Sequence, residues 1–434
     1  MVRKFILSVA MVCALLAVTG CHHKVQNPLA NIDSKQPDKG LFDRAMESMR
    51  KGHYQEARTL LDTLINTYPD SEYIARAKLA IGDAWFNEGG TAAWQQAEMQ
   101  YKDFQVFFPN LPEASEAQLK VAVIHYRQME KPDRDFAQAA RAAEEYKTLI
   151  SQYPDSPLVP EAKQRLREVQ EVLAERQFRI AHFYFLRDNI AASQARLQSL
   201  ISSYPLYSGA DEALFELGQL YERQANAMNT QTRMNAAMRE KLKAQFENKA
   251  IETYSKIITR YPAMSRADDA RKRLTALNAK VPLATPEAIA ANKTEQQSRS
   301  TDKMSEKLLS NFKKHPSVAR ATKVGEPPTG EEDVASAPAI VKALNDEITG
   351  IATATQQVGI DKVTGGKGDP GANQAAPTSD TTPKTDGAPP PAAPGQVNEV
   401  TGGQTTTPAA PADDKQDSSS KKKGKKGLRK LIPF

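Results

Sequence analysis

The chain has 434 residues, 40% of them hydrophobic and 25% charged, with a net charge of +6 at pH 7. This length is sufficient for two or three domains. The charge is modest, so it does not indicate a nucleic-acid partner, and none is expected. The only cysteines are Cys13 and Cys21, which excludes a framework of several disulfides.

Residues 1–20 have the features of a secretion signal. A basic start, Arg3 and Lys4, precedes a short apolar core that ends near Val18. The core is too short for a comfortable membrane span. We therefore expect this segment to direct export and then to be removed.

The signal ends in Val18-Thr19-Gly20-Cys21, which resembles a bacterial lipobox. This resemblance implies cleavage between Gly20 and Cys21 and lipidation of the Cys21 sulfur, with acyl chains such as palmitate anchoring the mature protein. The alternative is ordinary signal cleavage beside a chance cysteine. Cys13 leaves with the signal, so Cys21 has no partner for an internal disulfide, and acylation explains its presence.

Residues 21–39 are predicted to form a polar tether that contains Pro28 and Pro37. His22 follows the lipidated position. By resemblance to enteric lipoproteins, this residue favours transport to the periplasmic face of the outer membrane. His22 and His23 would bind a metal only weakly on such a tether, so we expect no metal site there.

Residues 40–280 repeat one pattern: an amphipathic helix ends at an aromatic residue followed by proline. In the first copy, apolar residues at spacings of three and four form one stripe, and Pro69 ends the helix. The spacing between copies widens along the chain. The five copies are Tyr68-Pro69, Phe108-Pro109, Tyr153-Pro154, Tyr204-Pro205 and Tyr261-Pro262.

An alanine-rich helix is predicted after each of these turns. Both halves of the unit recur in order, which indicates an all-α, tetratricopeptide-like solenoid of about five helix pairs. An irregular bundle whose helices happen to end in Tyr-Pro is the alternative. Residues 224–245 form a polar, methionine-bearing insertion in the last unit.

Residues 281–434 are predicted to form a long disordered C-terminal tail, rich in Pro, Thr, Ala and Lys. Two weak helical islands are expected inside it, at 301–314 and 337–349. A basic run at 421–430 suits either anionic lipid headgroups or a solvated chain end.

No catalytic motif is evident: the chain has no HExxH, GxSxG, CxxC or phosphate-binding glycine loop. We therefore expect no enzymatic activity and no cofactor. The paired acidic residues lie on predicted helix faces, where solvation explains them.

The lipobox, the tether and the five aromatic-Pro units together resemble the BamD family of outer-membrane assembly lipoproteins, also called ComL or YfiO. The first unit, Gly52 to Pro69, is similar to the family's opening repeat. The fourth unit is the most specific match, with Ala181-His182-Phe183-Tyr184 followed by Ser203-Tyr204-Pro205.

This resemblance implies partners. Members bind the POTRA region of a BamA-like barrel insertase through their C-terminal repeats and receive unfolded outer-membrane proteins at their N-terminal repeats, beside other assembly subunits. The insertase-facing arginine corresponds to Arg196, with Arg187 nearby, although a solvated helix position explains Arg196 equally. The substrate groove would lie near Tyr54, Trp85 and Phe86, unless these aromatics belong to the core.

Two other functions stay open. One is a tetratricopeptide lipoprotein adaptor in cell division or polysaccharide export. The other is a lipoprotein with peptidoglycan activity, which the missing catalytic residues weaken.

Overall fold

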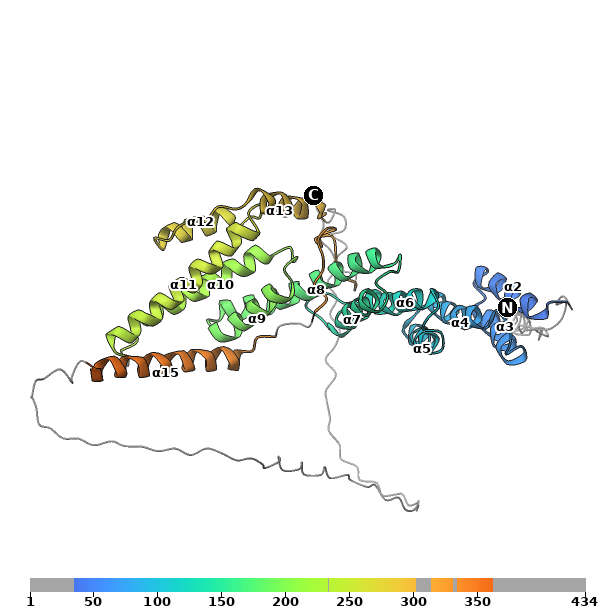
Figure 1. The fold of residues 1–434 in the computed structure, drawn as a ribbon. Coiled ribbons are helices and arrows are strands. Elements are labelled where there is room, and N and C mark those ends of the chain that lie inside the picture. The colour runs from blue at the N-terminus through green and yellow to red at the C-terminus, as the bar shows by residue number, and fades with distance from the viewer. Residues whose placement is uncertain (1–34, 233, 302–313, 331–333, 362–434) are drawn as a thin grey trace, which may run out of the picture. The chain divides into compact units, whose positions relative to one another are not determined.

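The computed structural model describes residues 35–232, 234–301, 314–330 and 334–361. Within these ranges the chain is helical, with no strand (Figure 1). This confirms the all-α prediction. The helices are α2 (Pro37–Arg50), α3 (Tyr54–Thr67), α4 (Ile74–Glu88), α5 (Thr91–Phe107), α6 (Glu113–Arg127), α7 (Ala137–Gln152), α8 (Val159–Leu186), α9 (Ile190–Ser203), α10 (Ala210–Met228), α11 (Ala236–Arg260), α12 (Ala267–Ala276), α13 (Pro286–Ser298) and α15 (Ala337–Asp361).

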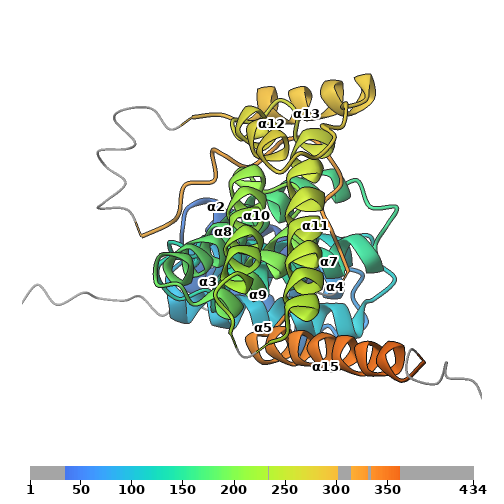
Figure 2. The same ribbon diagram turned by 90° about the vertical axis from the view of Figure 1, so that its left-hand side faces the viewer.

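Each helix from α2 to α12 packs against the next one in the chain. The pairs α3/α4, α5/α6, α7/α8, α9/α10 and α11/α12 correspond to the five predicted units, and α2 precedes them. Helices two apart also meet, as α8 does with α10. The solenoid prediction is therefore confirmed for the described residues (Figures 1 and 2).

The aromatic-Pro pairs close the first helix of every unit by one repeated hydrogen-bond pattern. Each aromatic residue is the C-cap of its helix, and the N–H three residues later donates to its carbonyl. Proline occupies the second position of that turn, where its fixed φ fits and no N–H is needed. These donors are Ser71, Leu111, Ser156, Tyr207 and Met264.

The core alternates alanines with large aromatic and aliphatic side chains. Tyr101, Tyr146 and Tyr254 are fully buried at equivalent places on α5, α7 and α11. Small residues on the facing helices leave room for these rings. The long apolar stripe of each helix is thus covered by its neighbours, as the stacked-repeat pattern predicted.

The insertion at 224–245 lengthens two helices. It includes the end of α10, the non-helical residues 229–232 and 234–235, and the start of α11. Met238, Leu242 and Phe246 are buried at spacings of four along α11. The extension is therefore a continued helical hairpin.

The predicted boundary at residue 280 is corrected by the structure. α13 follows it and packs on α11, residues 314–330 contact α8, and α15 packs on α9 and α11. The prediction failed because α13 buries polar residues, and because the segment at 314–330 has no helical periodicity. The island at 337–349 is helical as part of α15, whereas the island at 301–314 falls almost wholly outside the described residues.

Residues 1–34 and 362–434 also lie outside the described residues. Gly20, Cys21 and the basic run are therefore not placed. Of the helices in the described part of the chain, none is both long and apolar enough to cross a bilayer.

Candidate partner-binding site

The C-terminal end of α8 carries an exposed apolar pair beside a cation. Phe183 is 50% exposed and Leu186 is 68% exposed. The guanidinium carbon of Arg187, the C-cap residue of α8, lies 3.8 Å from the centroid of the Phe183 ring. Aromatic and arginine side chains in this arrangement are typical of protein-interface anchors.

Arg196 is exposed on α9, and its Nη1 donates to Gln177 Oε1 on α8 at 3.1 Å. Gln177 lies about 9 Å along the helix axis from Phe183, given the rise per residue of an α-helix. Arg187 and Arg196 therefore belong to adjoining helices of two successive units. The exposed pair Phe183 and Leu186 was missed from sequence, although both positions fall outside the buried stripe of α8.

Aromatic stacking and a hydrogen bond hold this end of α8 in place. The ring of His182 stacks on Phe178 and Phe185, with centroid distances of 6.0 and 6.2 Å. His182 Nδ1 lies 2.6 Å from Glu216 Oε1 on α10. Burial raises the pKa of Glu216 above its ordinary value, although the hydrogen bond and charge of His182 oppose the rise.

The turn from α8 to α9 is also fixed by polar contacts. Asp188 adopts a left-handed conformation with φ of 54°. Arg223 of α10 donates to the Phe185 carbonyl at 3.2 Å and to Asp188 Oδ1 at 2.9 Å. The Asn189 side chain caps α9 by accepting the N–H of Ala192. Arg187 thus projects from a rigid corner.

At the N-terminal repeats, the predicted groove aromatics are half-buried. Tyr54 begins α3, whereas Trp85 and Phe86 lie near the end of α4. The guanidinium carbon of Arg58 lies 3.5 Å from the Trp85 ring centroid, and that of Arg127 lies 4.5 Å from the Phe86 centroid. Trp85 and Phe86 therefore each have a cation over the ring, and Trp85 also packs against two apolar clusters of the core.

Arg58 is a buried cation that orders this region. It is 5% exposed, pairs with Glu88 of α4, and donates to Gln55 Oε1 at 2.7 Å. Trp94 donates from its indole nitrogen to the Phe86 carbonyl at 3.2 Å. The polar atoms around the aromatics are thus paired, as buried charge requires.

One group of side chains has the composition of a metal site. Glu98, His125 and Glu145 place one ligand atom each within 4.8 Å of one another. However, Lys102 Nζ lies 2.7 Å from Glu98 and 3.3 Å from Glu145, so an ammonium is already paired with both carboxylates. His125 Nδ1 contacts Gln138 Oε1 at 2.8 Å. The group is thus a structural ion-pair cluster between α5, α6 and α7.

Comparison with known proteins shows which family the repeat region resembles. The sequence model "YfiO: Outer membrane lipoprotein" matches residues 34–236. The repeat region is therefore similar to the YfiO family over just under half of the chain. Similar proteins include "Outer membrane protein assembly factor BamD" from Xylella fastidiosa, which is 23% identical over 226 residues, covering 50% of this chain and 75% of that protein.

Proteins of the same name from other bacteria have similar sequence identity to this chain. The one from Caulobacter vibrioides is 23% identical over 214 residues, covering 49% of this chain and 69% of the relative. The one from Haemophilus influenzae is 24% identical over 193 residues, covering 42% and 72%. The YfiO match runs from just before α2 to the first residue of α11, so it includes the Arg187 corner. α13, residues 314–330 and α15 lie beyond it.

Proposed function

We propose that this chain is a lipid-anchored scaffold at the periplasmic face of the outer membrane, where it takes part in the assembly of outer-membrane proteins. The observation that carries the proposal is the family match over the repeat region, together with relatives that are named as assembly factors. A stack of helical repeats fits this role because it offers an extended surface for other polypeptides.

The insertase-binding surface in this proposal comprises Phe183, Leu186 and Arg187 at the α8–α9 corner, together with Arg196 on α9. Phe183 and Leu186 would bury apolar surface on binding, and the arginines would orient the partner by pairing with its acidic groups. The rigid α8–α9 turn presents this surface with little ordering cost. The proposed partner is the POTRA region of a BamA-like insertase, with other subunits of the assembly complex bound elsewhere.

The N-terminal repeats would receive unfolded outer-membrane proteins near Tyr54, Trp85 and Phe86. Partly exposed aromatic rings suit transient contact with an extended chain, because they bind many side chains without fixed hydrogen bonds. The proposed role is non-enzymatic: the protein positions other chains and makes or breaks no covalent bond.

Reversing the charge of Arg196 tests the insertase-binding surface. The full chain carrying Arg196→Glu, purified with its partners from detergent-solubilised outer membrane, is expected to retain at least tenfold less POTRA-bearing barrel protein, because the loss of a hot-spot arginine from an interface costs about 2 kcal/mol or more. Arg271→Glu is the matched control, since Arg271 is an exposed arginine on α12.

Unchanged recovery of the barrel protein with Arg196→Glu would remove Arg196 from the interface. Recovery of cell-division or polysaccharide-export proteins in place of a POTRA-bearing barrel would overturn the assembly role itself. The helical circular dichroism of both variants serves to show that the fold is intact.

A further inference from the structure

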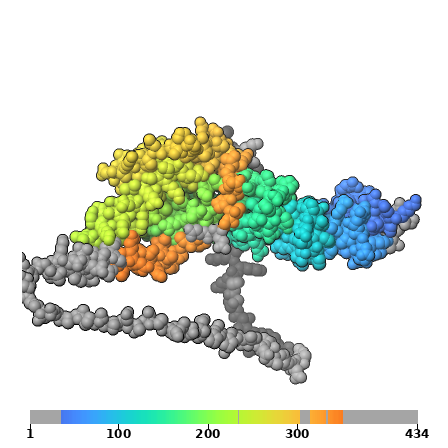
Figure 3. Space-filling model, in the orientation of Figure 1, coloured from blue at the N-terminus to red at the C-terminus, as the bar shows by residue number. Residues whose placement is uncertain are grey.

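Residues 314–330, termed the strap, cross the surface of α8 without forming a helix or a strand (Figure 3, orange). One guanidinium on α8 binds three strap carbonyls. Arg167 donates from Nε to Thr322 O at 3.2 Å, from Nη2 to Lys323 O at 3.1 Å and from Nη1 to Gly325 O at 2.8 Å. α8 thus holds the main chain of the strap.

The same kind of contact continues along the strap. Gln170, one turn after Arg167 on α8, donates to Pro328 O at 2.7 Å. Lys147 of α7 donates to Gly330 O at 3.4 Å. Main-chain carbonyls are present in every polypeptide, so this surface recognises an extended chain largely without regard to its side chains.

The strap side chains that are buried are small or are prolines. A small cavity lies beneath the end of the strap, between α7, α8 and the end of α9. The buried strap residues are Pro316, Ala321, Thr322 and Pro327. The cavity is lined by Ala143, Lys147, Gln170, Leu173, Tyr204, Pro328 and Gly330, among others.

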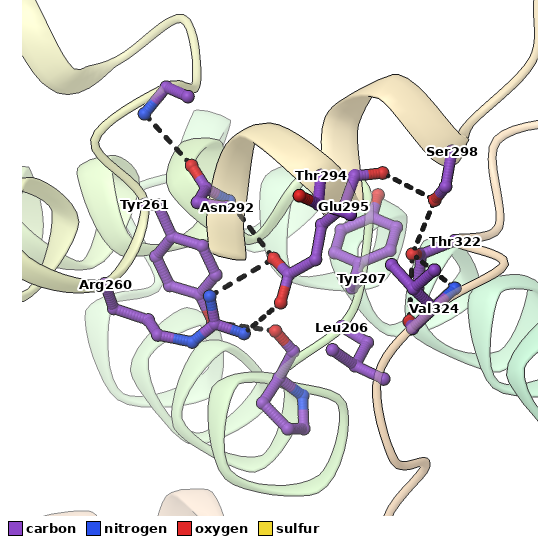
Figure 4. A network of polar contacts seen from close by, with 12 residues as sticks. Leu206, Tyr207, Arg260, Tyr261, Asn292, Thr294, Glu295, Ser298, Thr322 and Val324 are labelled. Carbon is purple, nitrogen blue, oxygen red and sulfur yellow. Dashed lines mark hydrogen bonds and ion pairs between the residues drawn. The ribbon is translucent and has the colours of Figure 1, made fainter. Parts of the chain in front are cut away.

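The middle of the strap is also fixed by hydroxyl groups (Figure 4). Ser298, at the end of α13, lies 2.9 Å from Thr322 Oγ1 and accepts the N–H of Lys323 at 3.0 Å. Thr322 in turn donates to the carbonyl of Val324 at 3.0 Å. Residues of α13 and α8 thus hold the same two strap residues from two sides.

We propose that the surface formed by Arg167, Gln170 and Lys147, the strap groove, is a binding site for an extended polypeptide segment rich in small residues and proline. In this proposal the strap is an internal ligand that occupies the groove, and a segment of another chain takes its place when the strap leaves. The site lies on different residues from the proposed insertase-binding surface and does not depend on the assembly role.

The nature of the contacts makes exchange feasible. The strap is held mainly by hydrogen bonds from side chains to its main chain, and each such bond contributes about 0.5–1.5 kcal/mol net. Its largest buried side chains are two prolines. An incoming extended segment would remake the same hydrogen bonds. If the groove is free of the strap for only a fraction of the time, its apparent affinity for an incoming segment is lowered by that fraction.

Gly325 gives a way to release the strap without altering the groove. Its φ is +92°, and a Cβ there would lie 3.1 Å from the Leu206 side chain, so Gly325→Val is strained in the bound strap. Gly330→Val is the matched control, because no atom lies within 4 Å of a Cβ at Gly330. Both substitutions are made in the full chain, and the probe is a labelled synthetic peptide with the sequence of residues 314–330.

The proposal expects Gly325→Val to bind the peptide at least tenfold more tightly than the unaltered chain and the Gly330→Val control. Hydrogen exchange of the amides at 319–325 should increase in parallel. Adding Arg167→Ala and Gln170→Ala to Gly325→Val is expected to remove the gain. A second peptide carrying Ala321→Trp should bind at least tenfold more weakly than the first.

Two outcomes would overturn the proposal. If exchange at 319–325 rises and peptide binding does not tighten, the groove is not a binding site. If the amides stay protected in Gly325→Val, the strap is a permanent part of the fold rather than an exchangeable ligand. Unchanged helical circular dichroism in each variant separates these outcomes from unfolding.

Discussion

Two glycines stand where a helix meets a tyrosine ring of the next helix. A Cβ built on Gly82 of α4 would lie 2.7 Å from Tyr101 of α5, and one on Gly218 of α10 would lie 2.5 Å from Tyr254 of α11. These distances are shorter than any real carbon contact. The absence of a side chain at these positions therefore lets the buried tyrosines fit.

Gly218→Ala is expected to lower the free energy of unfolding by about 1–2 kcal/mol, because the cost of overpacking exceeds the gain in helix propensity of up to about 1 kcal/mol. Urea unfolding followed by circular dichroism measures this change. Gly330→Ala is the control, since a Cβ there meets no atom within 4 Å. Equal unfolding midpoints for the two variants would contradict the packing argument.

Glu171 of α8 is a buried carboxylate with an unfavourable environment. It is 6% exposed and accepts the N–H of Ser208 at 2.9 Å. Burial raises its pKa above the ordinary value, despite the Ser208 hydrogen bonds and the charge of Arg299. A folded-state pKa above the unfolded one means that this group favours the fold below the unfolded pKa and loses that contribution as pH rises through the folded pKa.

Glu171→Gln removes this titration, so its stability relative to the unaltered protein is expected to increase as pH rises from about 4.5 towards neutrality. The measurement is the difference in unfolding free energy between the two proteins across this pH range. Any pH-independent effect of the glutamine side chain on stability leaves the slope of this difference against pH unchanged. A difference that is flat with pH would show that Glu171 does not titrate abnormally.

At the scale of elements, α13 docks through polar groups rather than an apolar stripe (Figure 4). Asn292 is fully buried, accepts the N–H of Ala263 at 3.0 Å and donates to Glu295. Glu295 binds Arg260 of α11 through both oxygens, at 2.7 and 3.1 Å. Glu295 is therefore the central group of the interface. A bidentate pair of this kind stabilises the contact and also fixes its geometry.

Glu295→Ala is expected to detach α13 while the repeats stay folded, because it leaves Arg260 without its carboxylate partner. Hydrogen exchange across residues 286–298 should rise by at least tenfold, with amides in α8 and α10 unchanged. Glu287→Ala, at an exposed position of the same helix, is the control. Loss of protection throughout the repeats would instead assign Glu295 a role in the global fold.

The sequence predicted those elements whose stability comes from apolar periodicity. The five helix pairs and their aromatic-Pro turns follow from stripes such as those ending at Tyr68 and Tyr261. α13 was not predicted because Asn292 and Glu295 occupy its buried face, where a helix pattern would have apolar residues. The strap was not predicted because its contacts are made through main-chain carbonyls, which any sequence has. Arg187 and Arg196 were predicted from the family resemblance, whereas the exposure of Phe183 became evident only in the structure.

For the whole molecule, the segments beyond the family match are tied to repeats far away in the chain. α13 joins α11, the strap joins α7 and α8, and α15 pairs with α11 through Glu347 and Lys249. These contacts close long loops, so each segment is ordered by the repeats rather than by local propensity. The strap groove and the proposed insertase-binding surface are therefore distinct surfaces on one scaffold.

A lipid at Cys21 would tie this scaffold to a membrane, since several acyl chains give firm anchoring. Cys21→Ser is expected to move the protein from the membrane fraction to the soluble periplasmic fraction, because serine cannot form the thioether. Cys13→Ser is the matched control: it lies in the predicted signal, so the mature protein should remain membrane-bound. Mass spectrometry of the mature N-terminus measures the acyl chains directly, and an unmodified Cys21 in a membrane-bound protein would require a different anchor.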